Sequence, residues 1–307
     1  MRLRDLETHQ LGTLRLLECF TRDDLSRYIT RFEKSFREHT GSDFMDYCRW
    51  VVRLYRAAKH VLGAALFQCE ADHVRDTGLG NLESYTAYYA FHHAVCAVTT
   101  LLPNVRFESL GIVRHQRCLN VLAHEVFPRQ PQHPTVQEML TDYNHLLALR
   151  EAFSYRIPLG RLGGSPEESA RLALDRAKDH VGRLIQLTNV LSHALHALAK
   201  LQFPGMDFDA QYSSRGRAME TDELLFSVLD IRDRMGTTSW MDDDDYRRLG
   251  QQFYKRGLVP IDWFIIEKLC EDLECAWWET DSTSANEGHN EEFSIRDVSR
   301  YLSSLMA

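Results

Sequence analysis

One stretch of the chain, residues 85–103, constrains the fold most strongly, because it contains no Asp, Glu, Lys or Arg and no helix breaker before its last residue. Such a segment suits a helix that is buried on most of its sides. Small residues recur in it at the alternating three- and four-residue steps of one helical face, which lets a neighbouring helix approach closely. This seam consists of Ala87, Ala90, Ala94, Ala97 and Leu101. We therefore expect the remaining helices to pack around this one.

A second face of the same stretch carries bulky side chains with polar tips. A buried donor or acceptor without a partner costs about 1–3 kcal/mol, so these tips need hydrogen-bonding partners if the helix is buried. We expect either a lined polar site or an interface on this side of the helix. The residues on this face are Tyr85, Tyr88, Tyr89, His92, Cys96 and Thr99.

A helical pattern continues through nearly the whole chain, and no series of alternating strand residues interrupts it. Polar, glycine- and proline-containing breaks separate the helices, and the clearest of them, at residues 205–218, marks a boundary. The sequence predicts an all-α fold. Its three parts are an N-terminal helical extension (1–41), a helical bundle (42–204) and an acidic helical C-terminal region (205–307).

Charge separates the last of these parts from the rest of the chain. From Arg217 to the end there are 10 basic and 20 acidic residues, whereas the net charge of the whole chain is −8. Strong non-specific binding of nucleic acid needs clustered positive charge, so the composition argues against it for the chain as a whole. A local basic face in the first two thirds remains compatible with these counts. The acidic region could bind a basic partner.

Other classes of site find little support in the sequence. The seven cysteines form no Cys-x-x-Cys pair, which indicates reduced thiols in a cytoplasmic protein. No uninterrupted apolar run reaches about 18 residues, so we expect no membrane span. Glu70 and His73 have the spacing of one half of a di-metal site, but the other half is missing. We therefore predict neither a metal nor a cofactor.

Residues 88–94, Tyr-Tyr-Ala-Phe-His-His-Ala, resemble the Tyr-Tyr-Ala-x-Phe-His-Ala-Ala helix of HEPN domains, which are helical bundles. His115, near the start of a following helix, and the segment Arg-Glu-Ala-Phe-Ser-Tyr at 150–155 are similar to further parts of that pattern. The resemblance covers about residues 43–200 and leaves the last hundred unmatched. It implies a HEPN-like bundle in which binding residues are Tyr88, Tyr89, His92 and His115.

Ribonucleases of this family carry an arginine and a histidine that are separated by four to six residues. The arginine neutralises a phosphate and the histidine moves a proton near neutral pH. Arg150 matches the arginine, but Tyr155 occupies the position of the histidine. Tyrosine titrates at about pH 10 and therefore accepts protons poorly at neutral pH. Arg117 and His124 also have the required spacing. The alternative interpretation is that they are two polar residues on a solvated helix face. These two pairs are the candidate catalytic residues.

The resemblance implies a HEPN-like, catalytically degenerate protein that acts through protein and RNA contacts. It further implies a homodimer in a prokaryotic defence or toxin–antitoxin setting. Two alternatives stay open, a metal-independent ribonuclease and a helical scaffold with no role in RNA binding. We prefer the binding protein to the nuclease because position 155 lacks the histidine that would transfer a proton.

Overall fold

The computed structural model describes residues 16, 20–77, 80–110, 115–127, 133–156, 168–203, 232–237, 241–256, 260–261, 269–270 and 295–306. Throughout these residues the regular structure is helical and contains no strand, which confirms the predicted all-α fold. Two of the helical segments, η3 and η4, are single π-helical turns that extend α5 and α6. The elements are α2 (Arg22–His39), α3 (Phe44–Thr77), α4 (Gly80–Leu101), η2 (Phe107–Ser109), α5 (His115–Val121), η3 (Leu122–Val126), α6 (Pro134–Glu151), η4 (Ala152–Arg156), α7 (Glu168–Gln202), α10 (Asp243–Arg256) and α13 (Ile295–Met306).

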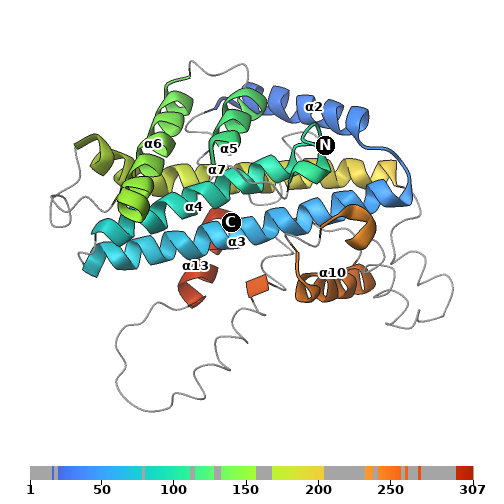
Figure 1. Cartoon of the computed structure of the whole chain (residues 1–307). Coiled ribbons are helices and arrows are strands. Elements are labelled where there is room, and N and C mark those ends of the chain that lie inside the picture. The colour runs from blue at the N-terminus through green and yellow to red at the C-terminus, as the bar shows by residue number, and fades with distance from the viewer. Residues whose placement is uncertain are drawn as a thin grey trace, which may run out of the picture.

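Three long helices, α3, α4 and α7, run alongside one another through the middle of the molecule (Figure 1). Figure 1 shows α2, α5 and α6 on one side of them and α10 and α13 on the other. α4 contacts α3, α5, α6 and α7, so the helix that contains residues 85–103 lies at the centre of the bundle. Its small residues are all buried, which confirms the predicted packing seam: Ala87, Ala90, Ala94, Ala97 and Leu101.

The helix starts follow local sequence signals. Thr21 caps α2, and its hydroxyl and the Asp24 carboxylate form a reciprocal capping box that satisfies two backbone donors at the helix start. Pro134 occupies the first turn of α6, where the missing amide proton costs nothing, as predicted. The sequence Ser-Pro-Glu-Glu at 165–168 predicts Ser165 as the cap of α7. Ser165 lies outside the described residues, and α7 is described from Glu168 onward.

A buried arginine fixes the end of α4. The Arg53 guanidinium on α3 donates to the backbone carbonyls of Thr100 at 2.9 Å, of Leu102 at 3.1 Å and of Val105. Burial lowers the pKa of Arg53 to about 10, so the side chain stays charged at neutral pH. A cation is favourable beside the carbonyls that a helix leaves unsatisfied at its C-terminus. Arg53 therefore ties α3 to the end of the central helix.

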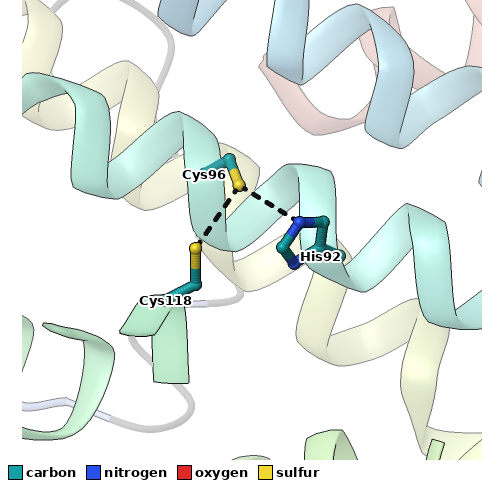
Figure 2. A group of neighbouring side chains, drawn as sticks. All are labelled: His92, Cys96 and Cys118. Atoms are coloured by element: carbon teal, nitrogen blue, oxygen red, sulfur yellow. Dashed lines mark hydrogen bonds between the residues drawn. The ribbon is translucent and has the colours of Figure 1, made fainter. Parts of the chain in front are cut away.

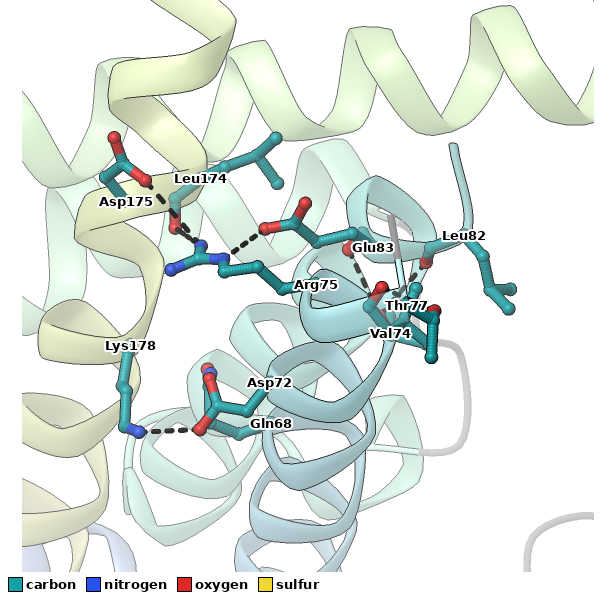
Figure 3. Close-up of polar contacts among 11 residues, drawn as sticks. Gln68, Asp72, Val74, Arg75, Thr77, Leu82, Glu83, Leu174, Asp175 and Lys178 are labelled. Atoms are coloured by element: carbon teal, nitrogen blue, oxygen red, sulfur yellow. Dashed lines mark hydrogen bonds and ion pairs between the residues drawn. The ribbon is translucent and has the colours of Figure 1, made fainter. Parts of the chain in front are cut away.

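Ion pairs join the same three long helices at the opposite end of the bundle (Figure 3). Arg75 on α3 pairs with Glu83 on α4 at 2.6 Å and reaches Asp175 on α7 at 3.8 Å. Lys178 on α7 pairs with Asp72 on α3 at 2.6 Å. Most of these side chains are exposed to solvent, so each pair contributes at most about 1 kcal/mol. They orient the helix ends more than they stabilise the fold.

The described helices of the acidic C-terminal region pack against the bundle. The Asp245 carboxylate of α10 accepts hydrogen bonds from Lys59 Nζ at 2.6 Å and 2.7 Å and from Tyr55 Oη at 3.1 Å. On α7, Gln186 donates to the carbonyl of Leu305 on α13 at 3.2 Å. Apolar residues of α10 and α13 join the same core as α3 and α7. Polar contacts thus reinforce a shared hydrophobic interface.

Two further predictions concern the organisation of the chain. The predicted boundary at 205–218 lies within residues 204–231, which are outside the description, as are most residues before Phe20 of the predicted extension. The division into three parts therefore stays a prediction. Among the helices that the structure describes, none combines the length and the apolar character needed to cross a membrane.

Candidate functional site

A chain of polar contacts lies between α4, α5 and α6, on the tyrosine- and histidine-bearing face of α4. His92 Nδ1 lies 2.7 Å from Tyr143 Oη of α6, and this hydroxyl lies 3.4 Å from Tyr88 Oη. Tyr88 Oη is hydrogen-bonded in turn to Nδ1 of His115 on α5. The two tyrosines and His92 are buried, whereas His115 is half-buried. We call these four residues the polar chain, which runs from the interior toward the surface.

Two assignments of protons, opposite in direction, satisfy every contact of the polar chain, and the one in which His92 is a donor is as follows. His92 Nδ1–H donates to Tyr143, the Tyr143 hydroxyl donates to Tyr88, and the Tyr88 hydroxyl donates to His115 Nδ1. This assignment leaves Nε2 of His92 without a proton. Burial, followed by the neighbouring His115, His93 and Arg150, lowers the pKa of His92 to about 3. The ring is therefore neutral at neutral pH. His92 is thus a buried, neutral imidazole whose Nε2 faces the Cys96 thiol.

Arg150, the predicted phosphate-binding arginine, lies near the surface beside several tyrosines. Its Nη2 donates to Tyr89 Oη at 3.1 Å, and its guanidinium carbon lies 4.9 Å from the centre of the Tyr155 ring. The Tyr85 ring lies 4.7 Å from that of Tyr89, centre to centre. Tyr155 is 70% exposed and Tyr85 is 37% exposed. We call Arg150, Tyr85, Tyr89 and Tyr155 the Arg150 surface.

The π-helical turn η4 positions Tyr155. It follows α6 directly, and π turns of this kind occur frequently at functional sites. The sequence predicts one helix running from Pro134 to about Arg156, and the structure confirms its extent while widening its last turn. Arg150 and Tyr155 are thereby brought into contact.

The second candidate pair, Arg117 and His124, lies elsewhere. Arg117 is on α5 and His124 is in the π turn η3, and both side chains are exposed. Neither of them makes a hydrogen bond or an ion pair with any residue in the described part of the chain. The pair therefore shares no contact with the polar chain or with the Arg150 surface.

His93 faces a different neighbour from His92, as expected for adjacent residues that lie about 100° apart around a helix. Its Nδ1 lies 3.0 Å from Nδ1 of His60 on α3. A Cβ atom added at Gly63 would lie 3.1 Å from His93 Nδ1, so glycine at this position leaves room for the ring. Burial lowers the pKa of His93 to about 4. This pair of imidazoles is thus a separate, neutral contact between α3 and α4.

Two cysteines lie beside the buried end of the polar chain (Figure 2). Cys96 follows His92 by about one turn of α4, and its Sγ lies 3.7 Å from His92 Nε2. Cys118 of α5 places its Sγ 3.8 Å from that of Cys96. The sequence places His92 and Cys96 on one helical face but contains no Cys-x-x-Cys signal for Cys118. The spacings His-x3-Cys at 92–96 and His-x2-Cys at 115–118 are the signal that could have found this group.

A second buried polar cluster joins α6 to α7. The Asp142 carboxylate accepts hydrogen bonds from Arg176 Nε at 2.8 Å and Nη2 at 2.7 Å, and lies 3.0 Å from His180 Nε2. Asp142 and His180 are completely buried, and Arg176 extends to Glu138 at 2.8 Å. We call Asp142, His180 and Arg176 the charged clamp. Sequence reasoning did not find it, because its members become neighbours only when α6 and α7 pack.

A cleft of about 550 Å³ lies between α2 and η3, apart from these clusters. Its walls combine aromatic residues, including Phe20, Tyr28 and Phe127, with the basic side chains of Arg31 and Lys34. None of the residues that the sequence singled out as a candidate site lines this cleft. It therefore adds nothing to the polar chain or the Arg150 surface.

Comparison of the chain with protein-family models, with curated proteins and with solved structures finds no match. The interpretation of the site therefore depends on its own chemistry and on the resemblance at residues 88–94. Two features have chemical potential. They are the cationic and aromatic Arg150 surface and the buried histidine and thiols at the inner end of the polar chain.

Proposed function

We propose that this chain is a HEPN-like protein that binds single-stranded RNA through the Arg150 surface without cleaving it. The supporting observation is that Arg150 lies among tyrosine rings of which Tyr155 is 70% exposed. An arginine fork pairs well with phosphate, and exposed aromatic rings stack on unpaired bases. The combination of both on one surface is typical of proteins that bind single strands.

The absence of cleavage in this proposal follows from where the imidazoles lie. A general acid or base has to reach the proton that it transfers, directly or through one water. His92, the histidine of the HEPN-like motif, is only 6% exposed and bonds to Tyr143. Position 155, beside the arginine, is a tyrosine. In this proposal the chain therefore keeps the arginine that binds phosphate but lacks a histidine placed to transfer a proton.

The resemblance also supplies a biological setting for this proposal. It places the chain in prokaryotic defence or in a toxin–antitoxin system, acting as a homodimer and with a protein partner. The 20 acidic residues from Arg217 onward suit a basic partner of that kind.

Metal-independent cleavage of RNA is a second candidate, and the position of His115 favours it. This ring is half-buried, and burial together with the nearby Arg150 charge lowers its pKa. Nδ1 already accepts a hydrogen bond from Tyr88, and a neutral imidazole so held can take part in proton transfer beside a bound phosphate. In this alternative Arg150 would hold the phosphate and His115 would replace the histidine that is missing at position 155.

Titration of a short fluorescent single-stranded RNA by anisotropy tests the proposal. We expect Tyr155→Ala to weaken binding about 5- to 150-fold, because stacking on one base contributes about 1–3 kcal/mol. Arg150→Ala should also reduce the dependence of the affinity on salt by about one phosphate contact. Arg171→Ala, which removes an exposed arginine on α7, is the matched control and should leave the affinity nearly unchanged.

The same proteins, incubated with RNA in EDTA between about pH 6 and 8, separate binding from cleavage, since this is the range in which histidine shuttles protons. Binding without cleavage supports the proposal. Cleavage that is lost in both His115→Ala and Arg150→Ala supports the second candidate instead. RNA binding that is the same in wild-type protein, Tyr155→Ala and Arg150→Ala contradicts both candidates, because the RNA would then bind another surface. Absence of RNA binding and of cleavage by the wild-type protein also contradicts both and leaves the scaffold alternative.

A further inference from the structure

The group formed by His92, Cys96 and Cys118 has no role in RNA binding by the Arg150 surface. All three residues are buried, and their ligand atoms lie within 4.8 Å of one another (Figure 2). Two of the residues come from successive turns of α4 and the third comes from α5. Nitrogen and sulfur ligands of this kind are the ones that zinc prefers in proteins.

The separations match those around a tetrahedral zinc ion. With zinc–sulfur bonds of about 2.3 Å and zinc–nitrogen bonds of about 2.0–2.1 Å, tetrahedral angles place two sulfurs about 3.8 Å apart and a sulfur and a nitrogen about 3.6 Å apart. The observed distances are 3.8 Å from Cys96 Sγ to Cys118 Sγ and 3.7 Å from Cys96 Sγ to His92 Nε2. Two of the three distances between the ligand atoms therefore already match those around a zinc ion.

A neighbouring residue also orients one of these ligands. Tyr143 Oη lies 2.7 Å from His92 Nδ1, and His92 Nε2 lies on the side of Cys96. When Nδ1 donates to Tyr143, the Nε2 lone pair is available to a metal ion. Metal-binding histidines are usually oriented in this way by a hydrogen bond to their second nitrogen. Two thiolates balance the charge of one Zn²⁺.

We propose that His92, Cys96 and Cys118 bind Zn²⁺ through Nε2 and two thiolates, tying α4 to α5 next to the polar chain. Three protein ligands leave a fourth position for water or another small ligand. His115 lies three residues before Cys118, and its ring centre is 4.6 Å from that of His92. Its ring nitrogens are not among the ligand atoms that lie within 4.8 Å of one another, so we do not count it among the ligands.

The test uses the full-length protein, reduced, freed of metal and then supplied with zinc or cobalt. We expect one zinc per chain after removal of excess metal, and a cobalt spectrum with thiolate charge-transfer and tetrahedral ligand-field bands. Cys96→Ser and Cys118→Ser should each weaken zinc binding by at least about 100-fold, since even residues that merely orient a ligand contribute about 10- to 100-fold. Circular dichroism establishes that each variant is folded.

Cys48→Ser is the matched control, because Cys48 is also a buried thiol on a helix but lies outside the group. It should bind zinc as the wild-type protein does. Folded, reduced wild-type protein that takes up neither metal would overturn the proposal. So would undiminished binding by the folded Cys96→Ser and Cys118→Ser variants, or a Cys96–Cys118 disulfide in a protein that binds no metal after reduction.

Discussion

Asp142 and Tyr143 are neighbours in sequence, yet their side chains enter two polar clusters of opposite character. Asp142 points to α7 and belongs to the charged clamp, where Arg176 and His180 satisfy its carboxylate. Tyr143 points to α4 and belongs to the polar chain, where it meets His92 and Tyr88. Both residues are completely buried. Two adjacent residues of α6, both completely buried, therefore make one charged contact and one uncharged contact.

The comparison shows that burial alone does not distinguish a structural cluster from a site. In the charged clamp each member is bound by an opposite charge or a hydrogen bond, and the geometry is closed. Burial raises the pKa of Asp142, but hydrogen bonds from His180 and Arg176 lower it by more. The pKa therefore lies below its ordinary value. The polar chain carries no such charge and ends in a neutral imidazole beside two thiols. The first arrangement holds helices together, and the second can also bind a ligand.

Breaking the charged clamp should have the largest effect on stability. Asp142→Ala leaves His180 buried without its acceptor and Arg176 without its bidentate partner. Removing one member of a buried ion pair costs about 3–5 kcal/mol of unfolding free energy, and urea denaturation measures it. Glu138→Ala removes a half-exposed partner of the same arginine and should cost no more than about 1 kcal/mol. Equal stabilities of the two variants would show that the clamp is not structural.

Removing one hydroxyl from the polar chain should have a smaller effect. Tyr143→Phe keeps the ring but takes away the acceptor of His92 Nδ1–H, 2.7 Å away. An unsatisfied buried donor costs about 1–3 kcal/mol, which urea denaturation of metal-free protein measures. Tyr89→Phe removes a half-buried hydroxyl that bonds to Arg150, which water can replace, and should change stability by at most about 0.5 kcal/mol. If Tyr143→Phe costs no more than Tyr89→Phe, water or another group satisfies His92.

Acid should act first on the neutral imidazoles and only later on the charged clamp. His60 on α3 faces His93 of α4, and Arg56 and Lys59 of its own helix add positive charge. Burial, then His93, lowers the pKa of His60 well below its ordinary value of 6.5. The unfolded state therefore binds the proton more readily, and stability that is complete above about pH 6.5 is lost as the pH falls below it.

The loss attributable to His60 is at most about 1.4 kcal/mol per pH unit, measured by urea denaturation in chelator between about pH 7 and 5. His60→Gln should flatten this part of the stability profile by about one proton. The charged clamp weakens only below about pH 4, as Asp142 takes up a proton at its lowered pKa. A profile that is flat between about pH 7 and 5 in both proteins would contradict this order.

Much of the fold was predictable from local patterns. The uncharged stretch at 85–103 identified the central helix, the alanine spacing identified its packing seam, and Thr21 and Pro134 marked helix starts. These features depend on side-chain volume, periodicity and hydrogen bonding within a few residues. Such interactions act within one helix and so can be read before the tertiary contacts are known.

The candidate site was only partly predictable. The aromatic face of α4 follows from spacing along a helix, whereas Arg150 and Tyr155 are candidates only through the family resemblance, and their contact depends on the π-helical turn η4. The partners of that face do not, because Tyr143 and Cys118 come from helices whose rotation about their own axes is set by packing. A single helix records which of its residues share a face, but not what lies opposite them.

The sequence by itself determined that the chain is helical, that one helix lies at its centre, and that this helix has one packed face and one polar face. Only the tertiary structure decided that Asp142 and Tyr143 would serve different clusters and that His92, Cys96 and Cys118 would meet. The physical reason is the range of the interactions. Helix periodicity and capping act over a few residues, whereas a buried polar group takes whichever partner the packing of distant helices brings within about 3–4 Å.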